Sequence, residues 1–90
     1  MAKTPTAKKI KNITKYAGET GLYFLSRGIK QGPITFKYIV VARYAPRSGK
    51  KNTSIWLADA EGNVRFIEPI REFRSDSVED ALTMLGYDLA

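Results

Sequence analysis

The sequence contains no histidine and no cysteine, which removes the side chains that carry out most proton transfer, thiol chemistry and transition-metal binding. Serine and threonine hydroxyls are present, but without histidine they need a lysine or carboxylate base, and no spacing in the chain proposes one. The carboxylates have structural explanations instead, in a turn at Asp59 and Glu61 and at a helix N-terminus over residues 76–80. We therefore expect a protein that is not an enzyme and that uses no metal and no other cofactor.

Basic residues are concentrated in one half of the chain. Residues 1–51 hold twelve of the fifteen lysines and arginines and a single acid, Glu19, whereas residues 52–90 hold three basic and eight acidic residues. A surface that faces a polyanion or an acidic protein explains this asymmetry. The alternative is that the two halves neutralise each other on the surface of the folded protein.

In the basic half, lysine and arginine are interleaved with aromatic side chains, as in Phe36-Lys37-Tyr38. Lysine and arginine neutralise phosphates and release counterions, and aromatic rings on a sheet stack on unpaired bases. The sequence predicts nucleic-acid binding, with DNA favoured over RNA, through a basic β-hairpin that enters a groove. The signature of RNA-recognition domains is absent. The candidate contact residues are Lys8, Lys9, Lys11, Lys37, Arg43, Arg47, Lys50 and Lys51.

A second class of function fits the same features. A small chain with divided charge and no catalytic residues is also typical of a phage- or mobile-element-type effector that binds and modulates a host protein complex. The acidic stretch from Glu68 to Asp80 is then the working surface. The candidate interface residues are Trp56, Glu68, Glu72 and Asp76. A lone tryptophan in a small domain also fits a core position.

The pattern of elements predicts an α+β fold. Strands are predicted over residues 22–27, 34–45, 53–59 and 64–68. A helix is predicted to begin near Ser77, where Asp80 completes a capping box, and to end before Gly86. Its apolar stripe needs a sheet face to pack on. We expect a small antiparallel sheet of three to four strands with one C-terminal helix on one face. The alternative is a small SH3- or OB-like barrel with an appended helix.

Ninety residues allow one domain, which we place at residues 16–87. Residues 1–15 are predicted to be a flexible basic arm, with residues 1–8 disordered when unbound, and residues 88–90 a tail. The predicted core consists of Leu22, Phe24, Phe36, Tyr38, Val40, Ile55, Leu57, Val78, Leu82 and Leu85. On the first strand, Tyr23 and Leu25 are the alternative inward pair, because a shift of one residue exchanges the faces.

The order of elements from Gly21 to Leu85 resembles the arm-type DNA-binding domains that precede some phage and mobile-element recombinases. The resemblance rests on Gly21-Leu22-Tyr23-Phe24-Leu25, two further strands and a late helix. The chain departs from that pattern by an apparent fourth strand and an acidic helix region, so no membership is inferred. Because no apolar run has the length of a membrane span and no apolar segment follows the charged N-terminus, we expect a location in the bacterial cytoplasm or nucleoid.

Overall fold

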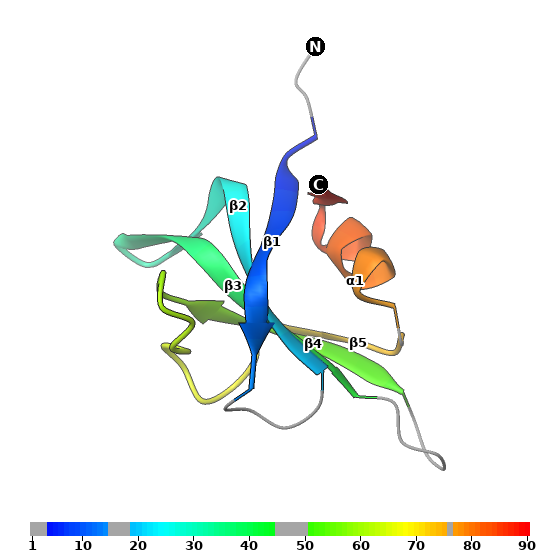
Figure 1. Ribbon diagram of the computed structural model, residues 1–90. Coiled ribbons are helices and arrows are strands. Elements are labelled where there is room, and N and C mark those ends of the chain that lie inside the picture. Colours follow the sequence, from blue (N-terminus) through cyan, green and yellow to red (C-terminus); the bar gives the residue numbers. More distant parts are fainter. Residues whose placement is uncertain (1–3, 15–18, 45–50, 76) are drawn as a thin grey trace.

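The structure is a computed structural model that describes residues 4–14, 19–44, 51–75 and 77–90. These residues form six strands and one helix: β1 (Thr6–Ile13), β2 (Glu19–Gln31), β3 (Ile34–Tyr44), β4 (Asn52–Ala58), β5 (Arg71–Phe73), α1 (Val78–Leu85) and β6 (Asp88–Leu89). The strands make one sheet in the order β5-β4-β3-β2-β1-β6, which curls around α1 (Figure 1). All neighbours are antiparallel except β1 and β6. The fold is therefore mostly β, with more strands than the sequence predicted and the expected C-terminal helix.

The sheet buries side chains on both faces. One face, which we call the helix face, packs against α1. The buried cluster between them contains Ala7, Tyr23, Leu25, Phe36, Ile39, Val41, Ile55 and Leu57 from the sheet, together with Leu82 from α1 and Tyr87 just after it. The opposite face, which we call the loop face, carries a smaller cluster of Ile13, Leu22, Val40 and Ala58. Residues 59–68, the covering loop, contribute Val64 to this second cluster. Along β2 and β3, the residues that point to the helix face and those that point to the loop face are therefore both buried.

This arrangement confirms part of the predicted core. The confirmed members are Leu22, Phe36, Val40, Ile55, Leu57 and Leu82. The other four are only half-buried, namely Phe24, Tyr38, Val78 and Leu85. The alternative pair Tyr23 and Leu25 is buried as well, on the helix face, so both choices of inward face on β2 are partly correct.

Residues 6–13 are a paired strand of the sheet, which corrects the prediction of a flexible arm over residues 1–15. β1 pairs antiparallel with β2 and buries Ala7 and Ile13. A bulge at Ile10 shifts the alternation, so these two side chains lie on opposite faces although they are six positions apart. Residues 1–3 lie outside the described residues.

The C-terminal residues also join the sheet instead of forming a tail. Asp88 donates its backbone N–H to the Pro5 carbonyl at 2.9 Å, and β6 runs parallel to the start of β1. Just before β6, the hydroxyl of Tyr87 donates to the backbone carbonyl of Arg27 at 2.6 Å. These contacts hold the end of the helix against β1 and β2.

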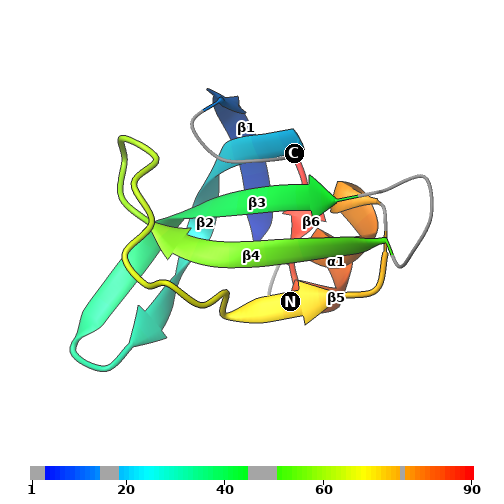
Figure 2. The ribbon, with the colours of Figure 1, turned by 90° about the horizontal axis from the view of Figure 1, so that it is seen from below.

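The β2–β3 hairpin is long and contains a corner. Its ladder breaks after Phe24 and resumes at Ile29. Gly28 lies in this corner, where an added Cβ would stand 2.5 Å from Thr35 Cγ2 and 3.1 Å from the Phe36 carbonyl oxygen, so a larger residue would have to displace Thr35 and crowd the backbone of β3. The sequence took this glycine as the end of a strand, but β2 continues to a two-residue turn at Gly32, whose φ of +61° suits that turn. The hairpin tip projects beyond the end of β4 (Figure 2).

The prediction of a strand over residues 64–68 is wrong. The preceding turn forms as predicted, with the Gly62 N–H donating to the Asp59 carbonyl at 3.0 Å. Beyond it, the chain makes a single bridge between Val64 and Ala58 and then passes over the loop face. The strand that returns beside β4 is β5, which the sequence described as a connector.

The helix begins and ends where the sequence predicted. Ser77 is the N-cap, and its hydroxyl oxygen accepts the Asp80 N–H at 3.2 Å. Gly86 ends the helix with a φ of +104°, and its N–H donates to the carbonyls of Leu82 and Thr83. No helix in the described part of the chain is long and apolar enough to cross a membrane.

Replacing the N-cap tests its contribution. Ser77→Ala leaves the Asp80 N–H without its acceptor, so we expect a loss of about 1 kcal/mol in the free energy of unfolding, measured by urea denaturation. Thr83→Ala is the control, because Thr83 is exposed on the same helix and alanine is the better helix former. A loss no larger than that of the control would show that the cap contributes little.

Candidate nucleic-acid interface

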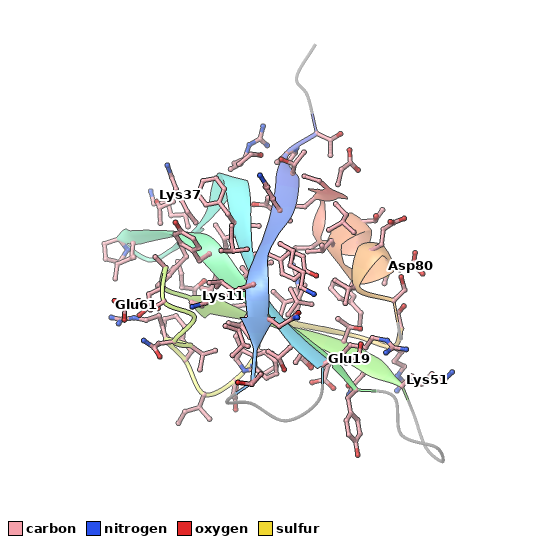
Figure 3. All side chains as sticks on the ribbon, viewed as in Figure 1. Lys11, Glu19, Lys37, Lys51, Glu61 and Asp80 are labelled. Atoms are coloured by element: carbon pink, nitrogen blue, oxygen red, sulfur yellow. The ribbon has the colours of Figure 1, made fainter. Side chains whose placement is uncertain are left out.

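β1 places three exposed lysines on the sheet. Lys8 and Lys11 fall on the loop face, because the bulge between them shifts the alternation of the strand by one residue. Lys9 falls on the helix face. Figure 3 shows Lys11 extending from β1 towards the side of Glu61 and away from Asp80 on α1. The three lysines that the sequence assigned to an arm are therefore held on a folded surface, two of them together.

Two aromatic rings lie next to these lysines. Phe24 is the cross-strand neighbour of Lys8 on one side and of Tyr38 on the other. The rings of Phe24 and Tyr38 meet edge to face, with centroids 5.4 Å apart and planes inclined by 62°. This is a favourable arrangement for an aromatic pair. Both residues are half-buried.

A groove opens beside Tyr38, where β3 continues past the end of β4. Its lining comprises Ile34, Thr35, Phe36, Lys37, Tyr38, Ala58, Asp59 and Arg65. Lys37 is exposed here, and Arg65 adds a second cation. We call Lys8, Lys11, Phe24, Lys37 and Tyr38 together the lysine-aromatic surface.

One carboxylate also lies at this groove. The backbone N–H groups of Asn63 and Glu61 donate to Asp59 Oδ1 at 2.9 and 3.0 Å. These bonds, led by the one from Asn63, hold the pKa of the Asp59 carboxyl below its usual value. The carboxylate therefore stabilises the turn of the covering loop. Its position marks one limit of the lysine-aromatic surface.

The remaining predicted contact residues are not gathered with Lys37. Arg43 lies six positions further along β3 than Lys37, which corresponds to a distance of about 20 Å. Arg43 Nη1 is 2.9 Å from Glu19 Oε2, so its charge is paired. Lys51 is exposed at the far end of the molecule from Lys37 (Figure 3). The other two predicted members, Arg47 and Lys50, lie outside the described residues.

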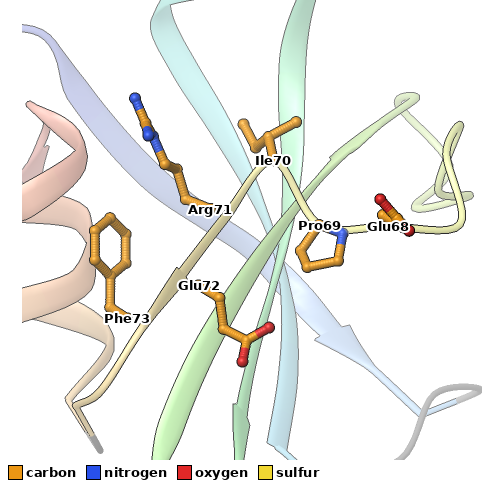
Figure 4. Close-up of a pocket in the computed structure, with 6 residues that line it drawn as sticks. All are labelled: Glu68, Pro69, Ile70, Arg71, Glu72 and Phe73. Atoms are coloured by element: carbon orange, nitrogen blue, oxygen red, sulfur yellow. The ribbon is translucent and has the colours of Figure 1, made fainter.

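The described residues predicted for a protein interface lie on β4 and in the segment from residue 68 to β5, away from β1 in the strand order. Trp56 is half-buried on the loop face, and its Nε1–H donates to the Ile67 carbonyl at 3.2 Å. Glu68 and Glu72 are exposed and line an open groove along residues 68–73. Within β5, Arg71 and Glu72 project to opposite sides (Figure 4). Asp76 lies outside the described residues.

Sequence reasoning missed two features of the site. It placed Phe24 and Tyr38 in the core, and it did not select Arg65. One signal was present in the sequence: no acidic residue occurs between Glu19 and Asp59, a span that covers β3, β4 and nearly all of β2. Among the described residues, no three carboxylates gather in a way suited to hold a metal ion.

No protein family, no curated protein and no solved structure matches this chain. The six-stranded order also departs from the element order on which the resemblance to arm-type DNA-binding domains was based.

Proposed function

We propose that the protein binds nucleic acid through the lysine-aromatic surface. The observation that supports this most is the combination of exposed lysines with half-exposed aromatic rings on adjacent strands of a sheet that is free of acids from Thr20 to Ala58. Lysines placed this way attract phosphates, and the release of condensed counterions makes the attraction favourable at low salt. A positive surface of this kind also speeds the encounter with a polyanion.

The test replaces both Lys8 and Lys11 by glutamine in one double variant. We expect weaker binding to labelled DNA at low salt. We also expect the slope of log affinity against log salt to become shallower by about 1.4 on single strands or about 1.8 on duplex, because two phosphate contacts are removed. Fluorescence anisotropy over a salt series measures the affinity and the slope.

The control for this variant is Arg71→Gln combined with Arg74→Gln. Both arginines are exposed, so the control lowers the net charge by the same amount at a different place. An equal loss in both double variants would show that net charge alone acts. If the unmodified protein binds no single-stranded DNA, duplex DNA or RNA at low salt, the proposal is wrong.

A protein partner is the second candidate, and one observation favours it. The covering loop exposes Ile67 almost completely, at 97%, and Phe66 at 44%, while Trp56 fixes the backbone of the loop beneath them. Exposed apolar side chains on a held loop are typical of an interface. A stoichiometric partner that stays bound after nuclease treatment and at high salt would favour this function over nucleic-acid binding.

A further inference from the structure

We propose that the lysine-aromatic surface takes single-stranded nucleic acid, with an unpaired base stacked on the Phe24–Tyr38 pair and the backbone held by Lys8 and Lys11. This inference rests on the proposed function and deepens it by naming the class of nucleic acid. It differs from the sequence-based hypothesis, which favoured a hairpin in the groove of duplex DNA.

The geometry of the aromatic pair supports stacking. In an edge-to-face pair, the ring that contributes its edge keeps both of its faces clear of its partner. Among the described residues, Phe24 belongs to neither buried cluster, and Tyr38 only borders the smaller one. An aromatic face that reaches the surface of a sheet beside lysines is the platform on which unpaired bases stack.

The covering loop leaves this part of the loop face open. Gly62 is buried against Ile13 and Leu22, and Val64 packs on the same cluster, so the loop covers the part of the sheet that holds these residues. Phe24 lies one row further along β2, towards the corner of the hairpin. A ligand therefore reaches Phe24 without displacing Gly62 or Val64, and on the Tyr38 side it meets Arg65 of the loop, which lines the adjoining groove.

The two lysines are spaced to follow a nucleic-acid backbone. Lys8 lies opposite Phe24, and Lys11 lies opposite Leu22, two residues along β2. Two residues of strand correspond to about 7 Å, which is close to the separation of neighbouring phosphates in one strand. The lysines and the aromatic pair thus offer contacts to backbone and base at the same time. Duplex DNA cannot use the aromatic contact, because its bases are already stacked and paired.

The experiment compares labelled oligo-dT, oligo-rU and an abasic strand of equal length with a duplex, by fluorescence anisotropy at low salt. We expect both single strands to bind more tightly than the duplex and the abasic strand. Phe24→Leu keeps the apolar bulk but removes the ring, and we expect it to weaken oligo-dT binding about tenfold, because the stacked base loses its aromatic partner. The salt slope should stay unchanged, because no phosphate contact is lost.

The matched control is Phe66→Leu. Phe66 is more exposed than Phe24 and also forms an edge-to-face pair, with Phe36, but it lies outside the lysine-aromatic surface. Circular dichroism checks that both variants are folded. A preference for oligo-dT or oligo-rU distinguishes DNA from RNA as the ligand, and either supports the inference. Equal binding of the abasic strand, or a Phe24→Leu affinity unchanged from the unmodified protein, would overturn stacking while leaving the proposed function in place.

Discussion

Replacing Leu82 with alanine is expected to lower the free energy of unfolding by about 2–5 kcal/mol, the range for truncation of a buried leucine. Leu82 is 0% exposed and is the helix residue that enters the main cluster on the helix face, beside Tyr23, Leu25 and Ile39. We expect α1 to close the resulting cavity only in part, because the segments on both sides of it are tied to the sheet: the Thr53 hydroxyl donates to the Ser75 carbonyl at 2.8 Å, and the Tyr87 hydroxyl donates to the Arg27 carbonyl at 2.6 Å. Urea denaturation followed by circular dichroism measures the change.

Met84 provides the control for this substitution. It lies on the same helix but is 55% exposed, so Met84→Ala is expected to change the stability by less than about 0.5 kcal/mol. Because both variants introduce the same residue into one helix, the difference between them reports the packing of α1 on the sheet. If Leu82→Ala is as mild as Met84→Ala, the helix does not pack on the sheet as described.

The elements that the sequence predicted well are those with strong local signals. Ser77 and Gly86 bound the helix through hydrogen bonds and a left-handed conformation that act within a few residues. The turns at Gly32 and Gly62 also form where the sequence placed them, because each needs a positive φ that glycine adopts at little cost. Such features depend on nearby residues alone and can be read without the tertiary structure.

β1 was not predicted as a strand because the alternation of buried and exposed residues along it is broken. The bulge at Ile10 moves Ala7 and Ile13 to opposite faces, so neither face of β1 carries a row of buried residues at a spacing of two. Between them, exposed lysines made the segment look like a solvated arm. Lysines are also what natural sheets place on edge strands to prevent pairing with another molecule, and the part of β1 beyond its pairing with β6 is such an edge.

The site was only partly predictable for a related reason. The basic residues were visible in the sequence, but their grouping depends on the corner in β2 and on the bulge in β1. These irregularities put Lys8 beside Phe24, whereas Lys37 and Lys51 end up far apart (Figure 3). Phe24 and Tyr38 looked like core residues because alternation shows which side chains share a face and does not show which face is covered.

Gly62 of the covering loop packs against Ile13 of β1. Gly62 is buried and has a φ of +87°, and an added Cβ would stand 2.6 Å from Ile13 Cδ1. We expect Gly62→Ala to lower the free energy of unfolding by about 2–4 kcal/mol, from the left-handed conformation together with overpacking. Gly32→Ala is the control for the backbone effect. Gly32 has a φ of +61° but nothing within 4 Å of an added Cβ, so we expect a loss of only about 1–2 kcal/mol.

A double-mutant cycle isolates the contact between the loop and β1. Ile13→Val removes Cδ1, the atom that the new methyl group would meet, and by itself should destabilise the protein by about 0.5–1.5 kcal/mol. Combined with Gly62→Ala, it makes room for the methyl group, so the double variant should be more stable than the sum of the single effects by about 1 kcal/mol or more. Effects that add within about 0.3–0.5 kcal/mol would mean that the two residues do not touch. The covering loop would then not be seated on the loop face, and the boundary that it sets for the lysine-aromatic surface would have to be redrawn.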